Sequence, residues 1–357
     1  MDTFDSLDDI QLALLLSLIA NQHCILTTEP SHLNELTTSV EAFIESSFGL
    51  EVATVSFEPE TSLDEFAGEV IREGGFVSRK SPSNLAHAVA GANITRTIDG
   101  TLPSPRLANV LLLKHLDRAS AQCQAQVLEL MIGKGIALMT RRMGIRSPKR
   151  FLIVAVLERS QGRVQLLPEL IDHFFISHYY DSFPFDSGRS YSTYDSQDRP
   201  EEDGDNESLS SVVRKAPSIS PSLDHGEVTF TEEYLDSLTL AAQRAFFHVE
   251  VKKYMMDIVS FLRLHRATAR GVTPLATRHF ELLVRCLAPL HNMTFVTPTL
   301  AQLAAPKVYA HRIEVCTPME ERSMMWGSNE VAVEAWLKGA TSETVVDDVL
   351  DMVKAPV

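Results

Sequence analysis

The stretch NVLLLKHLDRA, residues 109–119, decides the fold that we expect from this sequence. Its apolar run from Val110 to Leu113 is typical of a strand buried on both faces, as the central strands of parallel sheets are. Residues 119–131 follow with the pattern of a helix. A buried strand followed directly by a helix predicts one unit of an alternating α/β fold.

The same alternation extends to both sides of this stretch. We expect helices at residues 7–20 and 37–47, and strands at residues 23–26, 52–57 and 151–157. The first of these helices should be amphipathic, because apolar residues recur near helical spacing at Leu7, Ile10, Leu14, Leu15 and Ile19. Residues 1–184 are therefore predicted to form a parallel sheet with helices on both faces.

Two further regions follow this α/β core. Residues 185–226 are rich in Ser, Asp, Glu and Pro, so they bury too little apolar surface to offset the entropy of ordering, and we expect a disordered linker. Residues 227–357 predict a helical domain that ends in a helix at 345–353. Its apolar stripes are Tyr234, Leu238, Ala241 and Ala245; then Val251, Met255, Ile258, Val259 and Leu262; then Phe280, Leu283, Val284 and Leu287.

The composition narrows the possible partners. The chain has 357 residues and a formal net charge of -15, which disfavours general binding to nucleic acid or to an anionic membrane. Its four cysteines are too far apart for a CxxC pair, so we expect free thiols in a reducing compartment. Its longest apolar runs are too short to cross a bilayer. These features favour a cytoplasmic protein, and a nuclear one is not excluded.

Several local stretches resemble known proteins. The sequence LAPLHNMTFVTPTLAQLAAPKVYAHRI, residues 287–313, resembles the lid domain of the MoxR branch of AAA+ proteins, with Val296-Thr297-Pro298 opening one helix and His311-Arg312 closing it. Residues 166–174, LLPELIDHF, resemble a stretch of magnesium-chelatase ATPase subunits. The resemblance implies a P-loop NTPase-like (AAA+) parallel sheet followed by an all-α lid domain.

The resemblance also implies a phosphate-binding loop after the first strand, and this loop is degenerate. A working loop needs glycines, a Lys for the β- and γ-phosphates and a hydroxyl for Mg²⁺. Residues 27–35 read TTEPSHLNE, without glycine; Asn34 stands at the Lys position and Glu35 at the hydroxyl position. Glu29 and Glu35 would repel a polyphosphate. The pocket positions in this loop are Thr28, Pro30, Ser31, Leu33, Asn34 and Glu35.

The other ATPase positions implied by the resemblance are changed as well. Lys114 and His115 stand at the Walker B carboxylates, Glu158 at the sensor-1 position, His173 at the arginine finger and Leu275 at the sensor-2 arginine. We therefore expect no catalytic residue, no metal site, and no ATP or Mg²⁺ cofactor. Lys114 and His115, beside Asp117, are instead expected to form a structural ion-pair cluster.

Two features have competing interpretations. His173 and His178 are five residues apart at a strand-like run, and we expect separate surface or capping histidines on opposite faces. Five basic residues also lie close together, at Arg141, Arg142, Arg146, Lys149 and Arg150. They predict either a docking patch for an acidic partner, such as the acidic run at residues 201–207, or a solvated loop.

Three hypotheses follow for the function. The first is a pseudo-ATPase that binds protein partners, with other AAA+ subunits as candidates, and that is able to join an oligomer. The second is a magnesium-chelatase-like or MoxR-like ATPase with an atypical pocket that uses ATP and Mg²⁺. The third is an unrelated α/β protein with a helical appendage.

Overall fold

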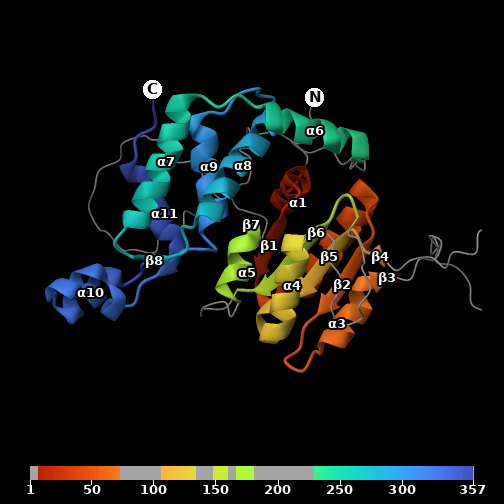
Figure 1. Ribbon diagram of the computed structural model, residues 1–357, viewed down its shortest axis with the longest axis horizontal. Coiled ribbons are helices and arrows are strands. Elements are labelled where there is room, and N and C mark those ends of the chain that lie inside the picture. Colours follow the sequence, from red (N-terminus) through yellow and green to blue (C-terminus); the bar gives the residue numbers. More distant parts are fainter. Residues whose placement is uncertain (1–6, 73–105, 134–147, 160–165, 181–228, 357) are drawn as a thin grey trace, which may run out of the picture.

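The computed structural model describes residues 7–72, 106–133, 148–159, 166–180 and 229–356. An α/β core lies beside a helical domain, and a short helical segment projects from the far end of that domain (Figure 1). The linker expected at residues 185–226 lies outside the described residues, so the predicted domain boundaries stay predictions.

The core contains a five-stranded sheet in the order β2-β5-β6-β1-β7. All four neighbouring pairs are parallel. The chain therefore crosses over β1 between β6 and β7, and the carboxyl ends of all five strands lie at one edge of the sheet. The strands are β1 (His23–Thr28), β2 (Val52–Ser56), β5 (Val110–Lys114), β6 (Leu152–Glu158) and β7 (Phe174–Tyr180).

Helices cover both faces of this sheet, as the sequence predicts. Alternate residues of β1, β2, β5 and β6 enter two separate apolar clusters, one on each face. One face packs against α1 (Asp9–Ala20), α2 (Leu33–Phe43) and the helical domain, and the other packs against α3 (Leu63–Val70), α4 (Ala121–Gly133) and α5 (Pro168–His173). Short elements join them: η1 (Pro30–His32), η2 (Ile44–Phe48), η3 (Leu116–Arg118), β3 (Ile71–Arg72) and β4 (Arg106–Leu107).

The helical domain begins with four long helices, each with a side chain at its N-cap that accepts a backbone hydrogen bond. Proline follows the threonine caps of α8 and α9, where its missing N–H costs nothing. The helices are α6 (Glu232–Arg244), α7 (Val249–Leu264), α8 (Pro274–Leu290), α9 (Pro298–Tyr309), α10 (Glu330–Leu337) and α11 (Ser342–Met352). The short elements are β8 (Thr268–Arg270), β9 (Glu314–Val315), η5 (Pro318–Glu320) and η6 (Arg322–Trp326).

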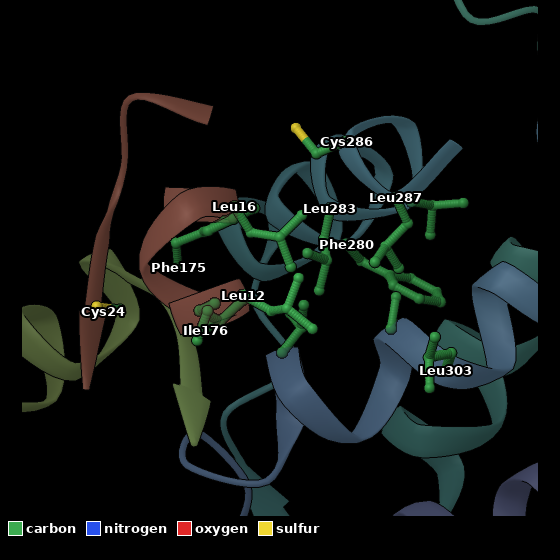
Figure 2. Packing of buried hydrophobic residues seen from close by; sticks show 14 of the residues in the cluster. Leu12, Leu16, Cys24, Phe175, Ile176, Phe280, Leu283, Cys286, Leu287 and Leu303 are labelled. Carbon is green, nitrogen blue, oxygen red and sulfur yellow. The ribbon is translucent and has the colours of Figure 1, made fainter. Parts of the chain in front are cut away.

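The helix α1 differs from its prediction. Every residue from Leu12 to Ile19 is buried, so the helix is not amphipathic. The physical reason is its position, because α1 contacts β7 and β1 of the sheet as well as α6 and α8 of the helical domain. Figure 2 shows Leu12 and Leu16 of α1 close to Leu283 of α8. One apolar cluster therefore runs from the sheet through α1 into the helical domain.

The predicted apolar stripes of α7 and α8 are confirmed, since all their members are buried. The stripe of α6 is shifted: Leu235, Leu238 and Ala242 are buried, whereas Tyr234 is 39% exposed. The helix expected at residues 37–47 begins earlier, at Leu33. The small antiparallel pair of β8 and β9 was not predicted, because strands of two or three residues leave little periodic signal.

Candidate functional site

The candidate site lies at the carboxyl edge of the sheet, beside the switch in strand order at β1. In open parallel sheets this edge is where ligands bind. Thr28, the last residue of β1, is in register with Glu158 at the end of β6. Lys114, the last residue of β5, pairs with Val156 of β6. The fold thus brings together three of the pocket positions that the sequence analysis identified.

The loop after β1 has the form of a short 3-10 helix that leads directly into α2. Pro30 opens this turn, and Leu33, the first residue of α2, is buried. Pro30, Ser31, Asn34 and Glu35 are exposed. The imidazole of His32 lies 3.3 Å from the carboxylate of Glu35. A loop of this form lacks the glycines that let backbone N–H groups approach phosphates closely.

Lys114 crosses from β5 to the beginning of α2. Its Nζ atom donates a hydrogen bond of 2.6 Å to Oδ1 of Asn34. By the resemblance, Asn34 stands at the phosphate-binding lysine and Lys114 at a magnesium-binding carboxylate. The positive charge at this edge therefore comes from the strand, where a metal ion would need a negative charge.

A second polar group lies at the ends of β5 and β6. Glu158 accepts a hydrogen bond of 2.7 Å from Nη2 of Arg118, and Nδ1 of His115 lies 3.5 Å from its other carboxylate oxygen. Burial lowers the pKa of His115, and the positive charge of Arg118 lowers it further. The sequence predicts that Lys114 and His115 form one ion-pair cluster beside Asp117. In the structure Lys114 bonds instead to Asn34, and His115 lies against Glu158. Sequence reasoning did not place Arg118 in the site, although it follows β5 by only four residues.

His173 and Leu275 lie at the junction of the core and the helical domain. His173 is the last residue of α5, and its Nδ1 atom lies 2.8 Å from the carbonyl oxygen of Glu169. Leu275 is half-buried in the first turn of α8. Next to it, Thr273 donates a hydrogen bond of 2.6 Å to Oδ1 of Asp172. The end of α5 is therefore joined to the beginning of α8.

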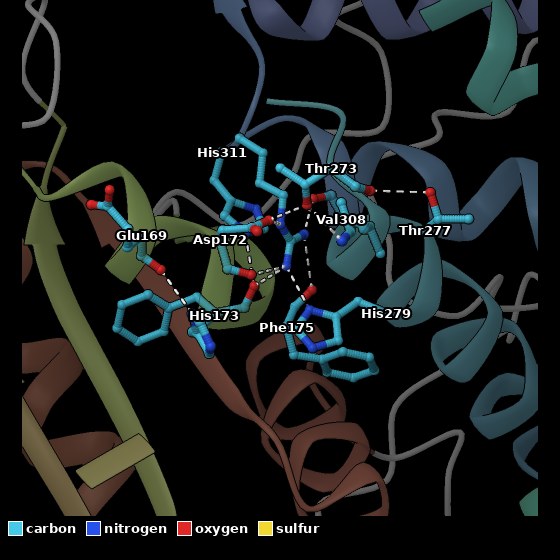
Figure 3. Close-up of polar contacts among 12 residues, drawn as sticks. Glu169, Asp172, His173, Phe175, Thr273, Thr277, His279, Val308 and His311 are labelled. Atoms are coloured by element: carbon cyan, nitrogen blue, oxygen red, sulfur yellow. Dashed lines mark hydrogen bonds and ion pairs between the residues drawn. The ribbon is translucent and has the colours of Figure 1, made fainter. Parts of the chain in front are cut away.

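A buried guanidinium forms the centre of this junction, and Figure 3 shows Asp172, Thr273, His279 and His311 drawn together there. Arg312 is 3% exposed. Its Nη2 atom lies 2.7 Å from Nδ1 of His279 and donates to the carbonyl oxygens of Asp172 and Phe174. Its Nε atom lies 3.5 Å from the carboxylate of Asp172. Burial lowers the pKa of Arg312 to about 10, and Asp172 opposes this shift, so the group stays charged at neutral pH.

The histidines around Arg312 support this arrangement. Burial, followed by the charge of Arg312, lowers the pKa of His279 to about 3, so this imidazole is neutral and accepts a hydrogen bond from the guanidinium. His311 is half-buried, and its Nε2 atom lies 3.1 Å from the carbonyl oxygen of Phe174. The His311-Arg312 pair therefore binds the helical domain to the edge of the core.

His178 corrects a prediction, since it is buried, with 7% exposure, and is not a surface histidine. Its Nδ1 atom lies 3.0 Å from Nζ of Lys307 on α9. His173 and His178 do not share one strand, because His173 ends α5 and β7 begins at Phe174. The two histidines are nonetheless separate, as expected.

Part of the predicted basic patch is bound within the chain. Arg150 is 8% exposed and forms an ion pair with Asp236 of α6. Lys149 is exposed, and its Nζ atom lies 2.8 Å from Glu232 and 2.9 Å from Asp236. Arg150 therefore cannot contribute to an exposed docking patch, because its guanidinium is buried. Arg141, Arg142 and Arg146 lie outside the described residues, and their docking role stays a prediction.

The described residues also bear on metal binding and on membrane insertion. In the described ranges, no group of three or more His, Cys, Asp or Glu side chains is arranged to hold a metal ion. Within the same ranges, none of the helices combines the length and apolar character needed to cross a bilayer. The four cysteines are described, and all are free and buried.

Comparison with known proteins gives the following matches. A family model described as the AAA lid domain matches residues 260–334. A solved structure, described as a "putative ATPase" from Cytophaga hutchinsonii ATCC 33406, superimposes with a TM-score of 0.62 at 12% sequence identity, over 98% of this chain and 89% of that chain. At this identity the likeness concerns the fold alone.

Two curated proteins are similar in sequence. "Uncharacterized protein YeaC" of Bacillus subtilis (strain 168) is 21% identical over 282 residues, which are 78% of this chain and 76% of that protein. "Maintenance of telomere capping protein 2" of the yeast Lachancea thermotolerans is 28% identical over 109 residues. The latter match covers 29% of this chain, which thus spans only 38% of the yeast protein.

Proposed function

We propose that this chain, which has the fold of an AAA+ ATPase core followed by a lid, is a non-hydrolysing module that binds or assembles with other proteins. The observation that carries the proposal is the hydrogen bond of 2.6 Å between Lys114 and Asn34. An ammonium group at a magnesium-binding position repels Mg²⁺, and Glu29 and Glu35 would repel a triphosphate from the loop. The charges of this pocket therefore disfavour binding of Mg·ATP.

The remaining polar groups of the pocket support the same function. Glu158 accepts a hydrogen bond from Arg118 and lies against His115, so this carboxylate is already matched by the protein itself. Binding a nucleotide here would require these contacts to be given up. The cost of desolvating and separating them would reduce any gain from nucleotide contacts.

The contacts of the lid support a module that keeps its shape without nucleotide. Arg312 of the lid donates to the backbone of the core beside Asp172, and Thr273 bonds to the Asp172 carboxylate. The apolar cluster around α1 also joins the sheet to the lid helices. A rigid surface of core and lid is well suited to binding a partner, because little ordering cost is paid on association.

The more specific parts of the proposal rest on sequence resemblance. We assign the chain a relationship to the MoxR and magnesium-chelatase ATPase subunits, on the stretches at residues 166–174 and 287–313. Its partners would then include other AAA+ subunits or further copies of this chain. The Lachancea thermotolerans relative is named for the maintenance of telomere capping, and participation in that process is a cellular setting to be tested by deleting the gene.

The test is a titration of the full chain with Mg·ATP and Mg·ADP by calorimetry, combined with an assay of phosphate release. We expect no saturable heat at millimolar nucleotide and no phosphate release above buffer. Saturable binding with phosphate release, abolished by Lys114→Ala but not by the matched surface change Lys252→Ala, would establish the second candidate, an ATPase with an atypical pocket.

A further inference from the structure

Residues 317–340 form a projection at the far end of the lid. In Figure 1 the helix α10 extends away from the packed lid helices. The short helix η5 contacts both η6 and α10. Of the eight residues of α10, Val333 is buried. A helix this short, with one buried side chain, gains little stability from its own packing.

The projection exposes large apolar side chains. Trp326 is 87% exposed, Met325 is 86% exposed and Val331 is 71% exposed. Both tryptophans of the chain, Trp326 and Trp336, lie in this segment. Burying one such side chain is worth about 2–3 kcal/mol, and this fold does not use it. Exposed clusters of Trp and Met are typical of protein interfaces and of their energetic hot spots.

The projection is held in a defined geometry. The guanidinium of Arg266 lies 4.6 Å from the ring centroid of Trp336 and forms a salt bridge of 2.8 Å with Glu321. Arg322 donates a hydrogen bond of 2.8 Å to the carbonyl oxygen of Arg263, at the end of α7. A partner therefore meets a surface that is already ordered, which lowers the entropy cost of binding.

The segment that carries this apolar surface, together with α11, has a net negative charge. Residues 317–352 contain eight Asp and Glu residues and two basic residues, a formal charge of -6 out of -15 for the chain. The exposed face of α11 carries Asp347, Asp348 and Asp351. His265 joins the two parts, because its Nε2 atom lies 3.7 Å from Asp348 and its ring centroid 6.4 Å from that of Trp336.

The carboxylates of α11 are close enough to affect one another. Partial burial raises the pKa of Asp347, and the negative charges of Glu343, Asp351 and Asp348 raise it further. A positive charge brought to this face would relieve that repulsion.

We propose that residues 317–340 and the acidic face of α11 form a docking surface for a cationic segment of a partner protein that also carries large apolar side chains. The inference rests on the proposed function, because it names the surface by which a binding module would meet its partner. The apolar cluster would supply affinity, and the surrounding carboxylates would select a basic partner. A second copy of the same surface fits poorly, because it would bring a second negatively charged face against the first.

The two tryptophans make the surface directly measurable, because the chain has no others. The probe is a 14-residue amphipathic helical peptide of Leu and Lys without aromatic residues, titrated into the full chain, and its matched control replaces every Lys with Glu. We expect the Leu/Lys peptide to give a saturable blue shift of tryptophan emission that weakens as salt rises. The Leu/Glu peptide should give none. No shift with the Leu/Lys peptide, or an equal shift with both peptides, overturns the proposal.

Matched variants locate the binding. We expect Trp326→Ser to weaken binding of the Leu/Lys peptide at least tenfold, with Trp336 as the remaining reporter, and Asp347→Asn/Asp351→Asn to weaken it several-fold. Phe246→Ser is the control, since Phe246 is 63% exposed on a different loop, between α6 and α7. An equal loss in the control would mean non-specific adsorption and would refute the assignment.

Self-association and nucleotide binding are separated from this result. A blue shift that grows with protein concentration alone, together with dimers in sedimentation velocity, would identify a second copy as the occupant and overturn the proposal. The peptide titration is made without nucleotide. If the chain bound and hydrolysed ATP, the proposed function would fail, while the peptide result would still decide this surface.

Discussion

The Nζ atom of Lys114, at the end of β5, lies 2.6 Å from Oδ1 of Asn34, in the first turn of α2. The two residues are 80 positions apart in sequence. The sequence resemblance predicts that both occupy positions where those ATPases carry groups that bind phosphate or metal. The lysine of this pair is therefore on strand β5, and helix α2 carries an asparagine at the position where the resemblance predicts a phosphate-binding lysine. This exchange of positions makes the pocket testable by charge substitutions.

Asn34→Lys should destabilise the protein by about 1–2 kcal/mol, because it removes a hydrogen bond and places two ammonium groups together. Lys114→Asn in the same chain should restore most of the loss, since it recreates the pair in reverse. Urea denaturation measures both effects. Thr38→Lys, at an exposed site one turn further along α2, is the control and should change stability by less than about 0.5 kcal/mol. Equal losses at both sites would contradict the contact.

Arg312→Met should cost about 3–5 kcal/mol, because it leaves several backbone carbonyls at the junction without their donor and removes the ion-pair partner of the Asp172 carboxylate. Asp172→Asn should cost less, since Arg312 keeps its bonds to the carbonyls of Phe174 and Phe175. Urea denaturation gives the ranking. Hydrogen exchange should rise first in β7 and α9, on the two sides of the junction, and remain slow in β5 and β6. Uniform exchange across the chain would show that Arg312 does not act at this junction.

Gly271→Ala should strongly destabilise the lid, by more than about 3 kcal/mol. Gly271 has a φ of +113°, and a Cβ atom there would lie 2.0 Å from the carbonyl oxygen of Arg312. Gly68→Ala is the matched control, because Gly68 lies in α3 with open space around its Cβ position. This control should stabilise the chain by about 0.5–1 kcal/mol through helix propensity. Thermal unfolding separates the two, and a neutral Gly271→Ala would refute the close approach.

The stability contributed by Lys307 should rise with pH between about 8 and 10.5. Burial lowers the pKa of Lys307 from 10.5 to about 8, although Asp9 and Glu343 oppose the shift. Between these pH values the unfolded chain binds more protons than the folded chain, so the free energy of unfolding increases with pH. The maximum slope for one group is about 1.4 kcal/mol per pH unit.

The measurement compares the wild type with Lys307→Met by urea denaturation at pH 8, 9 and 10. The wild type should gain stability relative to the variant over this range, because only the wild type carries the half-buried lysine. Lys253→Met is the control, since Lys253 is exposed on α7. A constant difference between wild type and Lys307→Met would show that the folded pKa of Lys307 is not lowered.

The sequence alone determined the alternation of strands and helices in the core. Runs such as Val110 to Leu113 are apolar at every position, and a strand covered on both faces requires this. The sequence also determined that the loop at residues 27–35 contains no glycine and no lysine, and no tertiary contact can change which residues the loop carries. The stripes of α7 and α8 were predictable for the same local reason, since helical periodicity is written in neighbouring residues.

Only the tertiary structure decided which polar groups meet. Lys114 bonds to Asn34, Lys307 to His178 and Arg312 to the backbone at Phe174, over separations of 80, 129 and 138 residues. It also showed that α1 is buried on all sides and that Arg150 is buried against α6. A local pattern records how one segment alternates between polar and apolar residues. The partner of a charge or of an apolar face depends instead on where the chain returns, and that position is fixed by packing of the whole fold.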